Sequence, residues 1–238
     1  MDPAPSDALA LGELRFVKRV ISAGLAMVLL AAVISVGGKW LGQSLVLAGH
    51  SDSLTSREIV IGNNVLAIPD NAIRFEDARR DGVAERLELY LHWPEMEGYS
   101  PEKRDAFNNA EKERSIVFLS IGEASMSRDM SGRLAPIYSK LIEPSGRAVA
   151  PGLTSHRFIP SSGYQDEELI IGTGQEAYVA RCLIAEAATQ SLAPCERDLR
   201  LGEELSLTYR FPRRLLAQAA ELDAKVRSRA QSWLRTAN

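Results

Sequence analysis

The sequence contains 238 residues, of which 45% are hydrophobic and 25% are charged. This composition excludes a disordered chain, a collagen-like repeat and a polytopic membrane protein. Lysine and arginine number 28 against 31 aspartates and glutamates, a formal net charge of −3. No basic excess exists to neutralise a run of phosphates, so no nucleic-acid partner is expected.

Near the N-terminus, residues 20–38 contain no charged side chain. As a helix this segment would span about 28 Å, close to the roughly 30 Å hydrocarbon core of a bilayer. We therefore expect a transmembrane helix at residues 20–38; the alternative, a buried core helix, is normally shorter and carries a polar stripe. Arg15, Lys18 and Arg19 precede the segment, which predicts that residues 1–19 are cytoplasmic.

The rest of the chain is then expected outside the cytoplasm, with a juxtamembrane linker at residues 39–56 and a periplasmic domain at residues 57–238. A cleaved signal peptide is the alternative. We favour an uncleaved signal anchor, because the apolar run is longer than that of a signal peptide and no small-residue cleavage site follows it closely.

Short β-rich segments make up most of the predicted domain. Residues 57–61 and 65–68 predict a hairpin around Gly62-Asn63-Asn64, which tolerate the positive φ of a tight turn. Residues 87–93 and 205–211 alternate apolar and polar side chains, which predicts strands with one buried face. Further strands are expected at residues 115–121, 155–159, 168–171 and 177–184. The short connections favour an antiparallel sheet.

Two segments have apolar residues at helical spacing. Residues 129–142 predict a helix kinked at Pro136. After Pro212, apolar residues recur every three or four positions as far as Trp233, which predicts a C-terminal amphipathic helix. We expect it to pack on the sheet, with a coiled coil as the alternative. The predicted fold class is α+β: an N-terminal transmembrane helix, then a mainly antiparallel β-sheet domain with the C-terminal helix.

The sequence contains two cysteines, Cys182 in a predicted strand and Cys195 in the predicted loop before the last strand. Outside the cytoplasm, two cysteines predict one disulfide. Two separate buried thiols are the alternative, because a sequence does not supply the geometry that decides between them.

No motif in the sequence points to catalysis, to a metal or to a cofactor. His50, His92 and His156 are isolated from one another along the chain, so no metal site is expected. Arg181 and Arg210 lie within apolar strands, where guanidinium groups usually have partners, and they are candidates for ion pairs or for a ligand site. The acidic run at residues 166–168 reads as a solvated strand entry.

Five segments of the predicted domain carry a family resemblance: NNVLAIPDNAIRF, RLELYLHWPEM, FIPSSGYQDEELI, YVARC and CERDLRLGEELSLTYRF. They resemble bacterial single-pass, membrane-anchored proteins of uncharacterised function. The resemblance implies the architecture above and supports the link between Cys182 and Cys195. It implies no activity and no catalytic residue.

These observations predict a non-enzymatic protein of the bacterial inner membrane whose periplasmic domain binds another envelope protein or assembles a complex. The expected partners are the membrane and that envelope protein. One alternative is a receptor-like domain that binds a ligand in a cleft lined by Arg181, Arg210 and aromatic residues. A third hypothesis is an envelope hydrolase.

Overall fold

The computed structural model describes residues 18, 21–22, 24–34, 49–173 and 177–235. The chain divides into two compact units, residues 1–49 and 50–238. In the first unit, residues 24–34 are helical. A helix needs about 20 residues to cross a bilayer, and no helix among the described residues is both long enough and apolar enough to do so. The predicted transmembrane helix at residues 20–38 is therefore wrong; residues 20, 23 and 35–38 of that range lie outside the described residues.

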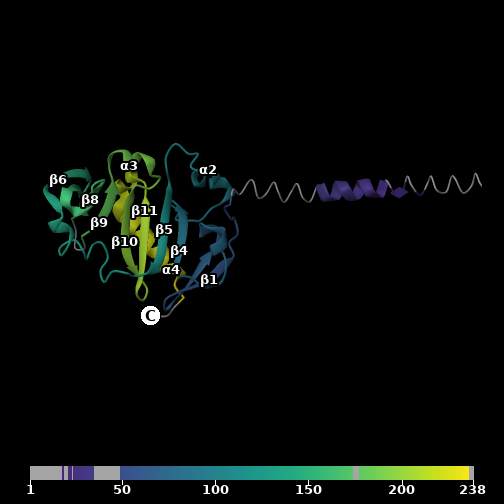
Figure 1. Ribbon diagram of the computed structural model, residues 1–238, viewed down its shortest axis with the longest axis horizontal. Coiled ribbons are helices and arrows are strands. Elements are labelled where there is room, and N and C mark those ends of the chain that lie inside the picture. The colour runs from purple at the N-terminus through teal and green to yellow at the C-terminus, as the bar shows by residue number, and fades with distance from the viewer. Residues whose placement is uncertain (1–17, 19–20, 23, 35–48, 174–176, 236–238) are drawn as a thin grey trace, which may run out of the picture. The chain divides into compact units, whose positions relative to one another are not determined.

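The second unit is mostly β-structure (Figure 1). Its strands are β1 (Ser56–Ile61), β2 (Asn64–Pro69), β3 (Gly82–Val83), β4 (Arg86–His92), β5 (Ile116–Glu123), β6 (Ile142–Ala150), β7 (Leu153–Phe158), β8 (Glu167–Gly172), β9 (Val179–Leu183), β10 (Cys195–Leu201) and β11 (Leu205–Phe211). Its α-helices are α2 (Arg104–Phe107), α3 (Ala185–Gln190) and α4 (Ala219–Trp233). Short 3-10 turns are η1 (Asp70–Ala72), η2 (Glu76–Ala78), η3 (Pro101–Lys103), η4 (Tyr138–Lys140), η5 (Pro160–Ser162) and η6 (Arg213–Gln218).

Two sheets form the unit. Eight strands lie in the order β4-β5-β11-β10-β9-β8-β7-β6, and every neighbouring pair is antiparallel. Figure 1 shows this order, with β6 at one end and β4 near the other. A smaller sheet joins β1 to β2 in the predicted hairpin and to β3 in parallel. The hairpin is confirmed, and Gly62 adopts the positive φ of 56° that its tight turn requires.

The main hydrophobic core lies between the inner face of the large sheet, α4 and the small sheet. The apolar side chains of β11 alternate as predicted, and Leu205, Tyr209 and Phe211 are fully buried. Leu222 and Val226 of α4 belong to the same core. The predicted C-terminal helix is thus present, and it packs on its own domain rather than in a coiled coil.

The predicted helix at residues 129–142 does not form. Pro136 lacks a backbone N–H and disfavours helical geometry at the residue before it, so the segment folds as turns that end in η4. Met130 and Tyr138 of this segment pack with Phe158 of β7 in a second, smaller cluster. Strands β6 and β10 were not predicted, and Cys195 begins β10 instead of lying in a loop.

The predicted fold class is therefore wrong. The structure is a mostly antiparallel β-sheet domain with few helices, rather than an α+β domain behind a transmembrane helix. Helical spacing alone overstated the helix content, because a single proline was enough to convert one predicted helix into turns.

Candidate functional site

The inner face of the large sheet changes from apolar to polar toward β6. On β7, Leu153 belongs to the main core, whereas Ser155 and Arg157 follow it on the same face. On β8, Ile170 is in the core and Glu168 lies two positions away. Polar side chains thus replace apolar ones in this part of the face, and a hollow opens there.

The hollow has a volume of about 670 Å³ and is bordered by five parts of the domain. We call it the arginine cleft. Its lining residues are Glu143, Ser145, Gly146, Arg147, Ser155, Arg157, Glu168, Leu183, Ile184, Ala185, Ala188 and Arg213. They come from β6, β7 and β8, from the segment that runs through the end of β9 into α3, and from η6.

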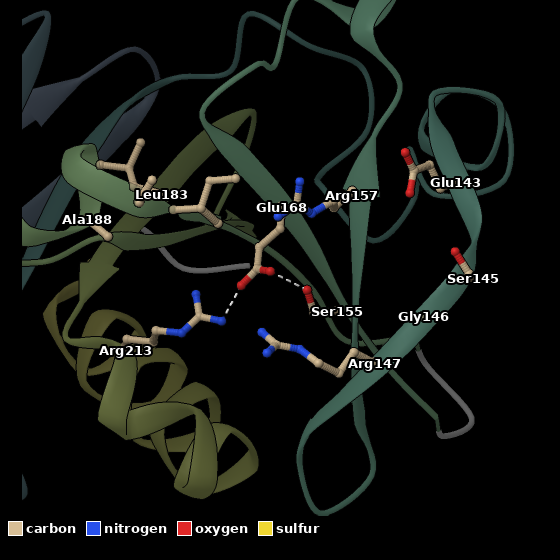
Figure 2. Close-up of a pocket in the computed structure, with 12 residues that line it drawn as sticks. Glu143, Ser145, Gly146, Arg147, Ser155, Arg157, Glu168, Leu183, Ala188 and Arg213 are labelled. Carbon is tan, nitrogen blue, oxygen red and sulfur yellow. Dashed lines mark hydrogen bonds and ion pairs between the residues drawn. The ribbon is translucent and has the colours of Figure 1, made fainter.

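Glu168 lies at the centre of the cleft and is only 5% exposed. The Ser155 hydroxyl donates a hydrogen bond to Oε2 of this carboxylate, and the Arg213 guanidinium donates one to Oε1. Figure 2 shows Glu168 between these two partners. Both oxygens therefore have a hydrogen-bond donor, as is usual for a buried polar group.

Arg147 and Arg157 have no such partner. Within the described part of the chain, neither side chain forms an ion pair or a hydrogen bond. Register brings them to the cleft, because Arg147 pairs with Ser155 and Arg157 pairs with Glu168. In Figure 2, Arg147 and Arg213 extend toward one another from opposite sides of the cleft. Since Arg213 is already paired with Glu168, the unpaired positive charges in the cleft are those of Arg147 and Arg157, and they favour an anionic ligand.

One wall of the cleft is apolar and is formed by Leu183, Ile184, Ala185 and Ala188. All four residues lie in the loop that the disulfide closes, since Cys182 and Cys195 are bonded across β9 and β10. The disulfide predicted from the sequence is thus present. The two cysteines are direct partners in the antiparallel register, and Glu168 pairs with Cys182 from the other side. The disulfide therefore lies next to the central carboxylate.

The two predicted arginines lie elsewhere. Arg181 and Arg210 are on the outer face of the large sheet, each bordering one of two hollows of about 240 and 290 Å³. These hollows share four lining residues, Arg86, Ser120, Glu196 and Thr208. The structure thus brings Arg181 and Arg210 to the same open surface. It does not bring them to the arginine cleft.

Their surroundings differ. Arg181 donates a hydrogen bond to Glu196 and pairs with Glu167 at 3.2 Å, while its guanidinium lies 5.1 Å from the Tyr164 ring centroid. Burial raises the pKa of Glu167, with Arg181 acting in the opposite direction. Arg210 forms no ion pair with a described residue. Arg181 therefore occupies a structural ion-pair network, and Arg210 remains exposed at the rim of a hollow.

The sequence did not single out the cleft residues. The sequence predicts that Glu168 lies at a solvated strand entry, and it predicts no strand around Arg147. One signal was available, because a glutamate immediately before the apolar run Leu169-Ile170-Ile171 can be buried with its strand. Neither Arg147 nor Arg213 could be assigned to the cleft from the sequence, because only the tertiary fold places their side chains beside Glu168.

Two solved structures resemble this chain. An immunity protein of the Stenotrophomonas maltophilia type IV secretion system is 14% identical, with a TM-score of 0.50 over 79% of this chain and 96% of that one. The Neisseria meningitidis iron-regulated outer membrane lipoprotein FrpD is 12% identical, with a TM-score of 0.43 over 79% and 98% of the two chains. No protein-family model and no curated protein sequence matches the chain. At 14% identity, the likeness to the immunity protein shows a shared fold and no function.

Proposed function

We propose that this protein is a non-enzymatic binding protein of the bacterial cell envelope, exposed outside the cytoplasm, which recognises another envelope protein through the arginine cleft. The observation that carries the proposal is the pair of uncommitted guanidinium groups in a preformed hollow. Arg147 and Arg157 lie there beside a carboxylate whose own two oxygens are already occupied.

The disulfide supports the proposed compartment. Disulfides persist in oxidising environments such as the periplasm and are rare in the cytosol. The bond between Cys182 and Cys195 joins two adjacent strands of the large sheet and closes the loop that forms one wall of the cleft. A location outside the cytoplasm would keep that wall in place.

The centre of the cleft allows a direct test of binding against catalysis. Ser155 is the hydroxyl group that a hydrolase would use as a nucleophile here, and its proton is directed to Glu168. That carboxylate also accepts from Arg213, so it serves as the partner of two fixed donors. Ser155→Ala should therefore leave the cellular role intact, whereas an acyl-enzyme mechanism would be abolished by it.

The experiment is site-specific photocrosslinking of the full chain in living cells. A photoreactive amino acid replaces exposed Ser145 on the cleft rim or, as a control, Val83 of β3, which is 87% exposed. We expect one discrete crosslinked protein from position 145 and none from position 83. Equal crosslinking from both positions, or none from either, would contradict the proposal.

A charge-reversal pair makes the experiment specific to the cleft. Arg147→Glu with Arg157→Glu should abolish the crosslink from position 145, because both uncommitted cations are reversed. Arg80→Glu with Arg86→Glu reverses two exposed arginines outside the cleft and should preserve it. A crosslink that persists in the first double variant would place the partner on another surface.

A more specific form of the proposed function is that of an immunity protein, whose partner would be a secreted effector. One solved structure with this fold belongs to an immunity protein of a secretion system, although a likeness at 14% identity shows the fold alone. The identity of the crosslinked protein separates the two versions: a secreted effector would support immunity, and a resident envelope component would support an assembly role.

A further inference from the structure

We infer that the arginine cleft binds an acidic segment of the partner protein in which a carboxylate side chain is accompanied by an apolar side chain. This inference rests on the proposed function and adds to it the chemistry of the partner. It is carried by two opposed surfaces of the same hollow, the arginines of β6 and β7 and the apolar wall at the end of β9 and in α3.

Charge determines the first requirement. Three guanidinium groups and two carboxylates line the cleft, those of Arg147, Arg157 and Arg213 and of Glu143 and Glu168. Since Glu168 and Arg213 are bonded to each other, Arg147 and Arg157 outnumber the remaining Glu143. Arg213 and Arg147 also line a neighbouring hollow together with Arg214, which extends the positive surface beyond the cleft. A guanidinium group donates two parallel hydrogen bonds to a carboxylate or a phosphate, so an anionic group is the expected occupant.

The two glutamates distinguish a carboxylate from a phosphate. With three arginines and two glutamates, the cleft has a formal net charge of +1. A carboxylate neutralises this charge, whereas a phosphate monoester carries nearly two negative charges at neutral pH and leaves a negative excess beside Glu143 and Glu168. Glu168 is held in place by Ser155 and Arg213, so it cannot turn away from the cleft without leaving both donors unpaired. The cleft is therefore better matched to a single negative charge.

The apolar wall determines the second requirement. Leu183, Ile184, Ala185 and Ala188 offer a surface for a side chain of the size of leucine. The wall consists of only four apolar residues, two of them alanines, which disfavours the acyl chain of an anionic lipid as the occupant. A volume of about 670 Å³ lies within the roughly 300–1,000 Å³ of ligand sites and suits a few residues of polypeptide.

The test measures binding of labelled peptides to the purified full chain by fluorescence anisotropy. The probe is a ten-residue peptide containing two glutamates and two leucines; one comparison peptide has glutamine in place of glutamate, and another has serine in place of leucine. We expect the first peptide to bind about tenfold more tightly than either comparison, since each loses one of the two contacts. Equal binding of the glutamine peptide would overturn the inference.

Variants locate the binding. Arg147→Gln with Arg157→Gln should reduce affinity for the glutamate–leucine peptide about tenfold and flatten its salt dependence, while Arg80→Gln with Arg86→Gln should change neither. Circular dichroism verifies that each variant is folded; both pairs are exposed, so folding should be retained. Unchanged affinity in the cleft variant would overturn the inference.

Two further measurements compare the peptide with other anions. Inorganic phosphate, and vesicles of one part phosphatidylglycerol to three parts phosphatidylcholine, are titrated against the same variants. Stronger arginine-dependent binding of either than of the peptide would overturn the inference in favour of phosphate or lipid. If the peptide fails while the crosslink from position 145 persists in cells, only the partner's chemistry is wrong; if the crosslink is also absent, the proposed function fails.

Discussion

Arg197 shows how a single buried charge can join several elements. It is 4% exposed on β10 and donates hydrogen bonds to Asp223 of α4, to the Ser131 hydroxyl and to the Val179 carbonyl, each at 2.8 Å. Asp223 also accepts from the Tyr209 hydroxyl at 2.9 Å. Burial by itself would raise the pKa of Asp223, but the neighbouring arginines, Arg197 foremost, bring it below its usual value. This network attaches α4 to the sheet.

Arg197→Met should therefore destabilise the domain strongly. The substitution leaves the Val179 carbonyl without its donor and deprives a half-buried carboxylate of one cation, at a cost of about 3 kcal/mol in the free energy of unfolding. Urea denaturation measures this loss. Arg200→Met, at an exposed position on the same strand, is the matched control and should cost less than about 1 kcal/mol. Equal losses in the two variants would mean that the network contributes no stability.

His50 is enclosed by aromatic rings at the start of the second unit. Its ring stacks on Tyr99 with centroids 4.7 Å apart, and its two nitrogens lie 3.1 Å from the Tyr90 hydroxyl and 3.1 Å from Asn108 Oδ1. The neutral ring satisfies both partners, because Nε2 donates to Asn108 and Nδ1 accepts from Tyr90. Burial lowers the pKa of His50 below 6.5, with Arg79 contributing in the same direction and the Asn108 hydrogen bond opposing it.

The stability of the domain should consequently fall as the pH drops below about 6.5, the ordinary pKa of histidine. In that range the unfolded chain binds a proton at His50 that the folded chain does not, so the contribution present at pH 7.5 is lost on acidification. Urea midpoints at pH 7.5 and pH 5.5 measure the effect, with His50→Phe as the control that keeps the ring but does not titrate. The wild type should lose more stability than this variant; the same loss in both would contradict the assignment.

The sequence predicted the interactions of some residues and not those of others, and the difference has a physical reason. The pairing of Cys182 with Cys195 was predicted from the presence of two cysteines, an expected location outside the cytoplasm and the family resemblance, and the structure contains the disulfide. The partners of Arg181 and of Glu168 depend on which strands become neighbours, and several polar residues in the chain could have filled each role. The burial of Glu168 was the hardest feature to predict from the sequence, because a glutamate at the start of a strand is normally solvated.

Among the helices and strands, the sequence predicted those whose apolar residues recur with a clear period, such as β4, β11 and α4, and it missed the irregular strand β6. Strands β4 and β11 alternate cleanly, and α4 has a continuous apolar face, so their positions follow from local sequence. Strand β6 has the sequence IEPSGRAVA, with a proline and a glycine, and its register shifts twice against β7. Such irregularity is typical of an edge strand and removes the alternation that would identify it. The cleft was missed because β6 was missed.

The disulfide-closed loop is the element on which the cleft depends most. In the double variant Cys182→Ser with Cys195→Ser, the free energy of unfolding should fall by about 3 kcal/mol, because a loop of this size is no longer closed in the unfolded chain. Hydrogen exchange should accelerate in residues 183–194 and remain unchanged in β4 and β5. The glutamate–leucine peptide should also bind more weakly. Unchanged exchange in the loop would show that the wall is held by packing alone.

At the scale of the whole molecule, the proposed function depends on where the hydrophobic core beneath the large sheet ends. The main core runs beneath most of the large sheet, and near β6 the inner face carries Ser155, Arg157 and Glu168 instead of apolar residues. Figures 1 and 2 show β6 at the end of the sheet and Arg147 beside η6 residue Arg213. No local pattern encodes this meeting of a strand and a turn that are distant in sequence. Architecture could be predicted in part from the sequence, and the site could not.

The most direct test of this account is the affinity of the crosslinked partner, purified from cells, for three forms of the full chain measured by calorimetry. We predict that Arg147→Glu with Arg157→Glu weakens binding roughly 100-fold relative to the wild type, since two attractive contacts become repulsive. Arg80→Glu with Arg86→Glu makes the same change in net charge outside the cleft and should alter the affinity less than about threefold. Equal weakening in the two double variants, or wild-type affinity in the first, would contradict the claim that the partner binds in the arginine cleft.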